Sequence, residues 1–95
     1  MTPSFIVQTS SHFERLFKKL HKHHPQLPGL FREVIEILEI DPYNRKRRYS
    51  IKKLVDPQQD GQYRLRFGRF RFRYDITGQT VELKTCTLRR EDTYN

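Results

Sequence analysis

The segment from Tyr63 to Tyr74 constrains the fold most strongly, because the spacing of its apolar residues changes phase in the middle. They occupy odd positions before Gly68 and even positions after it, so one straight strand would present them on both faces. A β-hairpin with a two-residue turn at Gly68-Arg69 removes this conflict, since glycine supplies the positive φ that the first turn position needs. The predicted cross-strand pairs are Phe67 with Phe70, Leu65 with Phe72 and Tyr63 with Tyr74.

Arginines fill the alternate positions of this hairpin and therefore gather on its other face. The predicted register sets Arg66 opposite Arg71 and Arg64 opposite Arg73, and like charges in opposed positions are destabilising. The simpler interpretation is a wet sheet face that carries charge for solubility. We favour a phosphate-binding face, because solubility alone would accept Lys, Glu or Thr, whereas the guanidinium fork donates paired hydrogen bonds to phosphate. The expected ligand is a single-stranded nucleic acid.

The rest of the chain predicts a strand, two helices and a last strand. Residues 5–8 are β-prone, and a capping box of Ser11 and Glu14 is expected to begin a helix that ends near His24-Pro25. A second amphipathic helix begins near Leu27 and closes at Asp41-Pro42, so the two form a helix hairpin. Residues 42–53 are interpreted as a basic connector, residues 56–61 as a loop and residues 80–87 as the last strand.

The last strand is expected to continue the meander through a turn around Thr77-Gly78. This register places Cys86 and Lys84 on the wet face, where an inert small residue is the commoner role for such a cysteine. The expected pairs are Tyr74 with Val81, Phe72 with Leu83, Arg73 with Glu82 and Arg71 with Lys84.

Length and charge fit one basic domain without internal disulfides. The 95 residues allow a single domain, residues 1–95, and carry a net charge of +8. Residues 1–41 hold as many acidic as basic side chains, so the excess lies in residues 42–95 and indicates an anionic partner for that half. A lone cysteine, no apolar run of membrane length and no signal-peptide pattern predict a cytoplasmic protein that does not enter a membrane.

Two further clusters have simpler explanations than a site. His21, His23 and His24 lack a neighbouring Asp, Glu or Cys, so a solvated helix end is favoured over a metal site, and no metal or cofactor is expected. The run from Arg45 to Arg48 is most simply a solvated loop.

The order of elements, the alternating hairpin and the closing Arg-x-x-x-Tyr of Arg90 and Tyr94 resemble the RelE/ParE superfamily of bacterial toxins. The resemblance covers the whole chain and implies an α+β fold in the order β-α-α-β-β-β, with a helix hairpin packed on a mainly antiparallel sheet of about four strands. By resemblance, the RelE branch cleaves mRNA in the ribosomal A site as an mRNA interferase, and the ParE branch poisons DNA gyrase. Either kind of toxin would be neutralised by a cognate antitoxin whose acidic segment wraps it.

Residue roles follow from the same resemblance. Arg71 would stabilise transition-state charge, Arg64 and Arg66 would bind phosphate and assist proton transfer, and Tyr94 beside Arg90 would stack on a base or position the attacking 2′-hydroxyl. Arginine is too strongly protonated to be a good base, which leaves the general base unassigned. A near-terminal tyrosine such as Tyr94 also often packs on a sheet edge. Further RNA contacts are expected from Lys84, Arg69, Arg73, Arg89, Lys52 and Lys53.

The resemblance is closer to the RelE branch, so the first of three possible functions is favoured and the other two are alternatives. The first is a ribosome-dependent endoribonuclease of the RelE type. The second is a gyrase inhibitor of the ParE type without chemistry of its own, and the third is an RNA-binding module.

Overall fold

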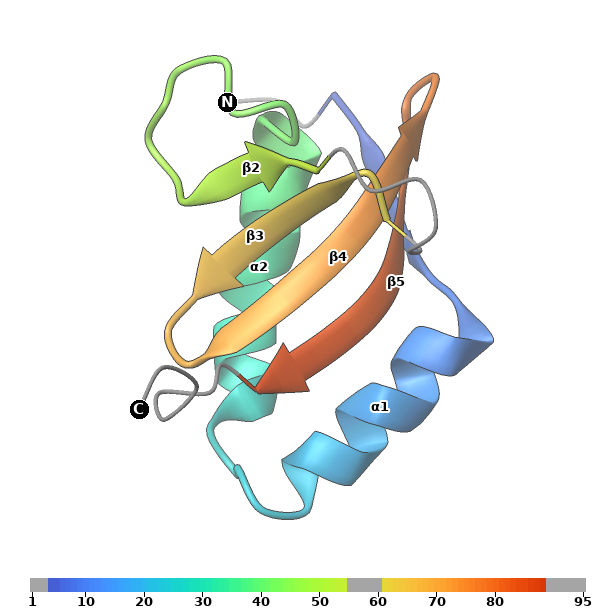
Figure 1. Cartoon of the computed structure of the whole chain (residues 1–95), viewed down its shortest axis with the longest axis vertical. Coiled ribbons are helices and arrows are strands. Elements are labelled where there is room, and N and C mark those ends of the chain that lie inside the picture. Colours follow the sequence, from blue (N-terminus) through green and yellow to red (C-terminus); the bar gives the residue numbers. More distant parts are fainter. Residues whose placement is uncertain (1–3, 55–60, 89–95) are drawn as a thin grey trace.

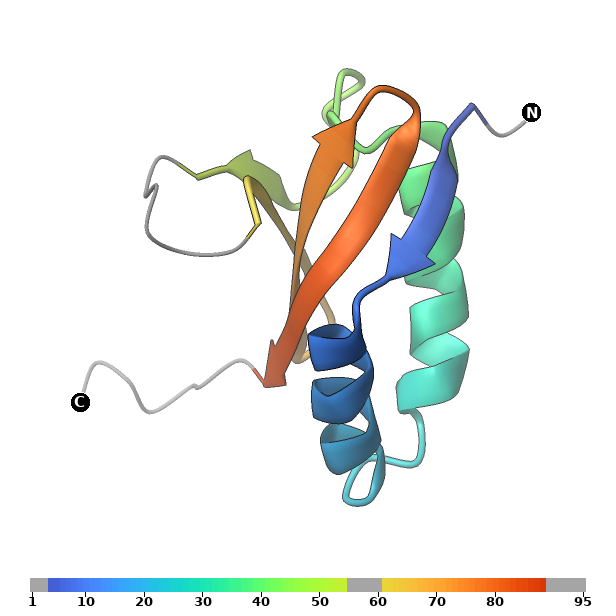
Figure 2. The same cartoon turned by 90° about the vertical axis from the view of Figure 1, so that its right-hand side faces the viewer.

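The computed structural model describes residues 4–54 and 61–88, which form a sheet with two helices on one side (Figures 1 and 2). Within these residues the sheet has five strands in the order β1-β5-β4-β3-β2. The edge strand β1 pairs with β5 in parallel, and the other neighbours are antiparallel. The elements are β1 (Ile6–Thr9), α1 (Ser11–His21), α2 (Leu27–Ile40), β2 (Ile51–Lys53), β3 (Tyr63–Phe67), β4 (Phe70–Thr77) and β5 (Thr80–Leu88).

The α+β class and the mainly antiparallel sheet are confirmed, and the sheet has one strand more than the expected four. The additional strand is β2, which lies at the end of what was interpreted as a connector and pairs with β3. The loop before β2 is fixed by side chains: the Asp41 carboxylate accepts from the backbone N–H groups of Arg45 (2.9 Å) and Lys46 (3.1 Å). Asn44 exchanges two hydrogen bonds with the backbone of Tyr49, at 2.8 and 3.2 Å. The basic run is thus held in a defined loop.

Helix α1 begins one residue earlier than the predicted capping box requires. Ser10 is the N-cap, and its Oγ accepts from the backbone N–H of Phe13 at 3.0 Å. The N–H of Ser10 donates to the carbonyl of Leu83 at 3.0 Å, which holds Ser10 in an extended conformation and fixes the helix start beside β5. Glu14 is used differently, because its Oε2 accepts from the Thr9 hydroxyl at 2.7 Å. Helix α1 ends at His21 rather than near His24, whereas α2 closes at Asp41 as expected.

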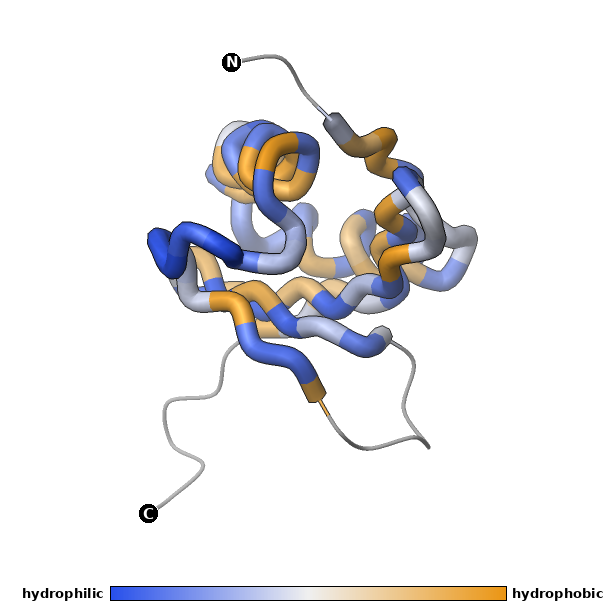
Figure 3. The backbone as a smooth tube through the Cα atoms, turned by 90° about the horizontal axis from the view of Figure 1, so that it is seen from above, coloured by the Kyte–Doolittle hydropathy of each residue, from blue (hydrophilic) through white to orange (hydrophobic). Residues whose placement is uncertain are grey.

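The predicted hairpin is confirmed in every pair. Phe67 lies opposite Phe70, and the positive φ of Gly68 (62°) forms the turn. The buried side chains of β3 and β4 pack beneath the helices, where the rings of Phe13, Phe31 and Phe72 lie 5.4 to 6.4 Å apart. The alternation of hydrophobic and hydrophilic positions along the strands is visible in Figure 3. The buried core consists of Phe13, Leu27, Val34, Ile37, Leu38, Tyr63, Leu65, Phe70, Phe72, Tyr74, Val81, Leu83 and Cys86.

The predicted register between β4 and β5 is wrong, for two physical reasons. The turn lies at Gly78-Gln79, one residue later than expected, because Gly78 takes the positive φ (60°) and Thr77 pairs with Thr80. A β-bulge then inserts Lys84 between the partners of Arg73 and Tyr74. The observed pairs are Tyr74 with Leu83, Arg73 with Thr85, Phe72 with Cys86 and Arg71 with Thr87.

The bulge also reverses the predicted orientation of Cys86. An extra residue shifts the alternation of faces, so Leu83 and Cys86 both point into the core. Cys86 is 1% exposed rather than on the wet face. None of the described helices is long and apolar enough to cross a membrane.

Candidate phosphate-binding face

The open side of the sheet carries two rows of side chains that run across the strands. One row places Lys52 opposite Arg64 and Arg64 opposite Arg73, with Thr85 beyond. The second places Arg66 opposite Arg71, with Thr87 beyond. Within the described parts of β2 to β5, neither row contains a carboxylate. We call the five cations of these rows the cationic face: Lys52, Arg64, Arg66, Arg71 and Arg73.

Hydrogen bonds to the neighbouring loops position two of these arginines. The Arg73 Nη2 donates to the carbonyl of Gly61 at 3.0 Å. A Cβ at Gly61 would lie 2.8 Å from the Cβ of Arg73, and Gly61 has a φ of +95°, so this close approach requires glycine. In the second row, the side-chain Nε of Arg66 donates to the Ser50 hydroxyl at 3.4 Å. The backbone N–H of Arg66 donates to the Ser50 carbonyl at 2.9 Å. The serine before β2 is thus part of the site.

Arg71 lies at the centre of the cationic face. It stands between Arg66 on β3 and Thr87 on β5, and its side chain is partly buried. Its Nε is buried without a hydrogen-bond partner among the described residues. A buried donor without a partner is costly, so an anion that accepts from this guanidinium would recover the lost hydrogen bond.

Acidic side chains lie at one end of the face, near the turn after β4. Asp75 is opposite Glu82, and Asp75 Oδ1 accepts from the backbone N–H of Gln62 at 2.7 Å. Glu82 forms an ion pair with Lys84 at 2.7 Å. Glu82 therefore neutralises Lys84 and not Arg73, which corrects the predicted partner. Lys84 lies in the bulge and not opposite Arg71.

The remaining predicted residues are placed less centrally or lie outside the described residues. Arg69 is exposed in the hairpin turn. Lys53 pairs with Tyr63, so its register position belongs to the helix-covered side of the sheet and not to the cationic face. Arg89, Arg90 and Tyr94 lie outside the described residues. Three hydroxyls of the face could not be recognised from the sequence: the observed pairing places Thr85 and Thr87 in the two rows, and the Ser50 hydroxyl accepts from Arg66.

The arrangement can bind and stabilise negative charge, and it holds no evident proton acceptor. Among the described residues the two rows contain only cations and hydroxyls, with no Asp, Glu or His. Burial raises the pKa of Tyr74 above its usual range, and its hydroxyl donates to the Pro42 carbonyl at 2.7 Å in the core. Burial likewise raises the pKa of the Cys86 thiol to about 12. Neither group reaches the cationic face.

The histidines do not join this site. His21 and His23 are exposed at the end of α1, and the rings of His24 and Phe70 form a T-shaped pair with centroids 5.3 Å apart. In the part of the chain that the structure describes, no group of three or more His, Cys, Asp or Glu side chains could hold a metal ion.

Comparison with solved structures identifies the fold. No protein-family model matches the sequence, and no curated protein matches it. A chain of the toxin–antitoxin complex RelBE2 from Mycobacterium tuberculosis is similar with a TM-score of 0.73 and 22% identity, over 93% of this chain and 100% of that chain. A chain of the archaeal RelE-RelB complex from Pyrococcus horikoshii OT3 is similar with a TM-score of 0.67 and 21% identity, over 93% of this chain and 98% of that chain. The chain therefore has the fold found in RelE-RelB toxin–antitoxin complexes, as the resemblance to the RelE/ParE superfamily implied.

Proposed function

We propose that this chain is the toxin of a toxin–antitoxin system and cleaves mRNA on the ribosome, with the cationic face as its RNA-binding surface. The observation that carries the proposal is the pair of cross-strand rows, in which five cations face one another without a carboxylate among the described strand residues. Like charges that lie opposite each other, as those of Arg66 and Arg71 do, repel, and a phosphate backbone across the face would turn this repulsion into attraction. The shared fold with chains of RelE-RelB complexes supports the same function.

In the proposed reaction, the RNA 2′-hydroxyl attacks the adjacent phosphate and the 5′ oxygen leaves. Arg71 donates hydrogen bonds to the phosphate oxygens as their negative charge increases, which is the largest contribution that such a site can make. Arg64 and Arg66 hold the flanking phosphates. Tyr94 and Arg90 are proposed to position the base and the hydroxyl next to the scissile bond.

Proton transfer is the step that the described residues do not supply. A general base must reach the 2′-hydroxyl within about 3 Å, and the described rows offer only hydroxyls, guanidinium groups and the ammonium group of Lys52. This feature favours a second candidate, a toxin of the ParE type that binds DNA gyrase without chemistry of its own. The cleavage assay separates the two candidates.

Primer extension on a translated message, with and without the purified chain, tests the proposal. New 5′ ends within codons are expected, and Arg71→Gln should lower the cleavage rate by about 100- to 1000-fold because it removes one charge-stabilising donor. The exposed Arg32→Gln on α2 is the matched control and should cleave like the parent chain. An intact message together with accumulating cleaved plasmid DNA would replace the proposal by the gyrase inhibitor.

A toxin of this kind needs a partner in its own cell. We propose a cognate antitoxin with an acidic segment that covers the cationic face, in a cytoplasmic complex. Addition of such an antitoxin should abolish RNA binding by the chain. The affinity of the antitoxin for the chain should fall steeply as the salt concentration rises, because the contacts are between charges.

A further inference from the structure

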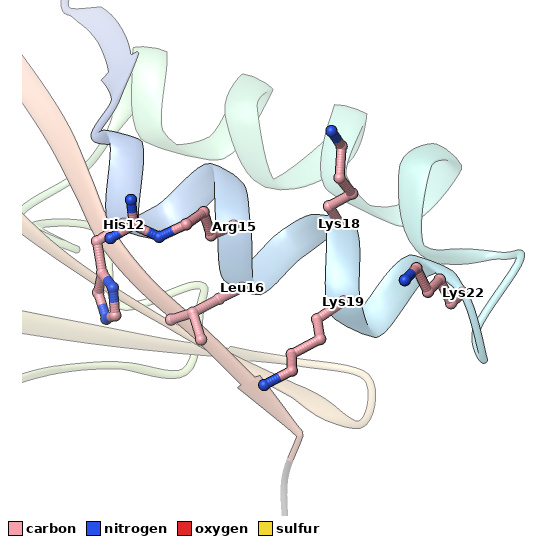
Figure 4. Close-up of a pocket in the computed structure, with 6 residues that line it drawn as sticks. All are labelled: His12, Arg15, Leu16, Lys18, Lys19 and Lys22. Carbon is pink, nitrogen blue, oxygen red and sulfur yellow. The ribbon is translucent and has the colours of Figure 1, made fainter.

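A second basic surface lies on α1, apart from the sheet. Its side chains line a hollow of about 400 Å³, and none of them belongs to the cationic face. Figure 4 shows His12, Leu16 and Lys19 extending from the same side of the helix. The hollow is lined by His12, Arg15, Leu16, Lys18, Lys19 and Lys22.

Within the described parts of the chain, no acidic neighbour balances the charges of this hollow. No carboxylate lines it, and Glu14, the acidic residue of α1, is bonded to the Thr9 hydroxyl. Among the described residues no ion pair involves its arginine or its lysines. The helix itself is fixed, because Phe13 is buried in the core and Ser10 is bonded to β5. These cations are therefore presented by a rigid element.

The spacing suits a row of phosphates. Arg15 and Lys22 are seven residues apart, which is about 10 Å along a helix axis. A backbone that runs along the helix can therefore present neighbouring phosphates to more than one of these cations. Small-molecule pockets are lined mostly by apolar side chains, whereas this hollow offers only Leu16.

A protein segment would find better anchors elsewhere. The cleft of about 320 Å³ between the helices contains three aromatic rings, which are the kind of surface that an apolar side chain of a partner needs. It is lined by Phe13, Phe17 and Phe31 together with Thr9, Glu14, Lys18 and His21. The basic hollow lacks such anchors, so charge is its means of recognition.

We propose that the α1 hollow binds the sugar–phosphate backbone of RNA at a distance from the cationic face. The proposal rests on the proposed function in that RNA is the ligand. The hollow adds affinity for the RNA without reading its sequence, because phosphate contacts carry no base information.

A salt titration tests this site separately from cleavage. The probe is a single-stranded oligoribonucleotide with 2′-O-methyl groups, which lacks the attacking hydroxyl. Replacement of three cations, Arg15→Gln, Lys19→Gln and Lys22→Gln together, should make the slope of log affinity against log salt shallower by about 2, because each contact with a single strand contributes about 0.7. At 0.1 M salt the affinity should fall by about 100-fold.

Two controls separate charge from structure. The charge-conserving triple variant Arg15→Lys, Lys19→Arg and Lys22→Arg should keep the slope, and so should Arg32→Gln. An unchanged slope in the glutamine variant would overturn the proposal. A slope that becomes as shallow in the charge-conserving variant as in the glutamine variant would also overturn it. Tighter competition by polyglutamate than by RNA of equal charge would also overturn it and assign the hollow to an acidic protein. Because the probe cannot be cleaved, absence of mRNA cleavage would refute the proposed function and leave this result standing.

Discussion

The cationic face predicts that removal of its central charge makes the free chain more stable. We expect Arg71→Gln to raise the melting temperature while it removes RNA cleavage. Ordinary surface substitutions change stability little, and core substitutions lower it. A gain in stability at the proposed site would therefore indicate that its charges are arranged for a ligand.

The neighbours of Arg71 give the magnitude. Arg66 lies directly opposite, Arg64 is the diagonal neighbour on β3, and Arg73 is two residues along β4. Two unit charges about 7 Å apart in water repel by roughly 0.2–0.3 kcal/mol at physiological salt once screening is included. Arg64 and Arg73 have further interactions of their own, so only the repulsion by Arg66 is counted in full. Its contribution of about 0.2–0.3 kcal/mol corresponds to roughly 1–2 °C in the melting temperature of a domain of this size.

Thermal unfolding followed by circular dichroism at 0.02 M and 0.5 M salt measures this effect. The increase in melting temperature of Arg71→Gln over the parent chain should be largest at low salt and nearly vanish at high salt, because screening weakens the repulsion in the parent chain. Arg32→Gln is the control, since Arg32 lies four residues before Glu36 on α2 and should be neutral or slightly destabilised. A lower melting temperature for Arg71→Gln, or a gain independent of salt, would refute the reasoning.

The core gives two further predictions. Tyr74→Phe leaves the Pro42 carbonyl without its 2.7 Å hydrogen bond and should lower the free energy of unfolding by about 1–2 kcal/mol in urea titrations, and an unchanged value would show that another donor replaces it. Burial raises the pKa of the Cys86 thiol to about 12, so the folded chain keeps the proton while the unfolded thiol ionises from about pH 8.5. The free energy of unfolding therefore falls as the pH rises through this interval. Between pH 7 and pH 10 it should fall by about 1–2 kcal/mol more in the parent chain than in Cys86→Ala. Equal losses would mean that the thiol is accessible to water.

The hairpin could be predicted from the sequence because its signals are local. The phase change of the apolar residues and the glycine between them fix the pairs of β3 and β4 without knowledge of the rest of the chain. The register of β5 could not be predicted in the same way. Either Thr77 or Gly78 could begin the turn, and the bulge at Lys84 depends on how both ends of β5 meet their neighbours. Strand β2 has only three residues and exists through its pairing with β3.

The candidate site was accordingly predicted in part. Alternation alone places Arg64, Arg66, Arg71 and Arg73 on one face, and this placement agrees with the observed pairing. The role of Ser50 and the separation of Lys84 from Arg71 follow from contacts between distant segments. The hollow on α1 was missed because lysines on the outer side of an amphipathic helix are ordinarily solvated.

The geometry of the cationic face is set by the core on the opposite side of the same strands. A slip of β3 against β4 by one residue would bury the arginines and expose Leu65 and Phe72, which are fully buried. A slip by two residues would leave each side chain on the same face of the sheet. It would, however, move the turn away from Gly68, whose φ of +62° is unfavourable for other residues. The positions of the guanidinium groups are therefore fixed before any ligand binds. Substitutions on the open face can change which anion is bound, while the spacing of the contacts stays as the buried aromatic pairs dictate.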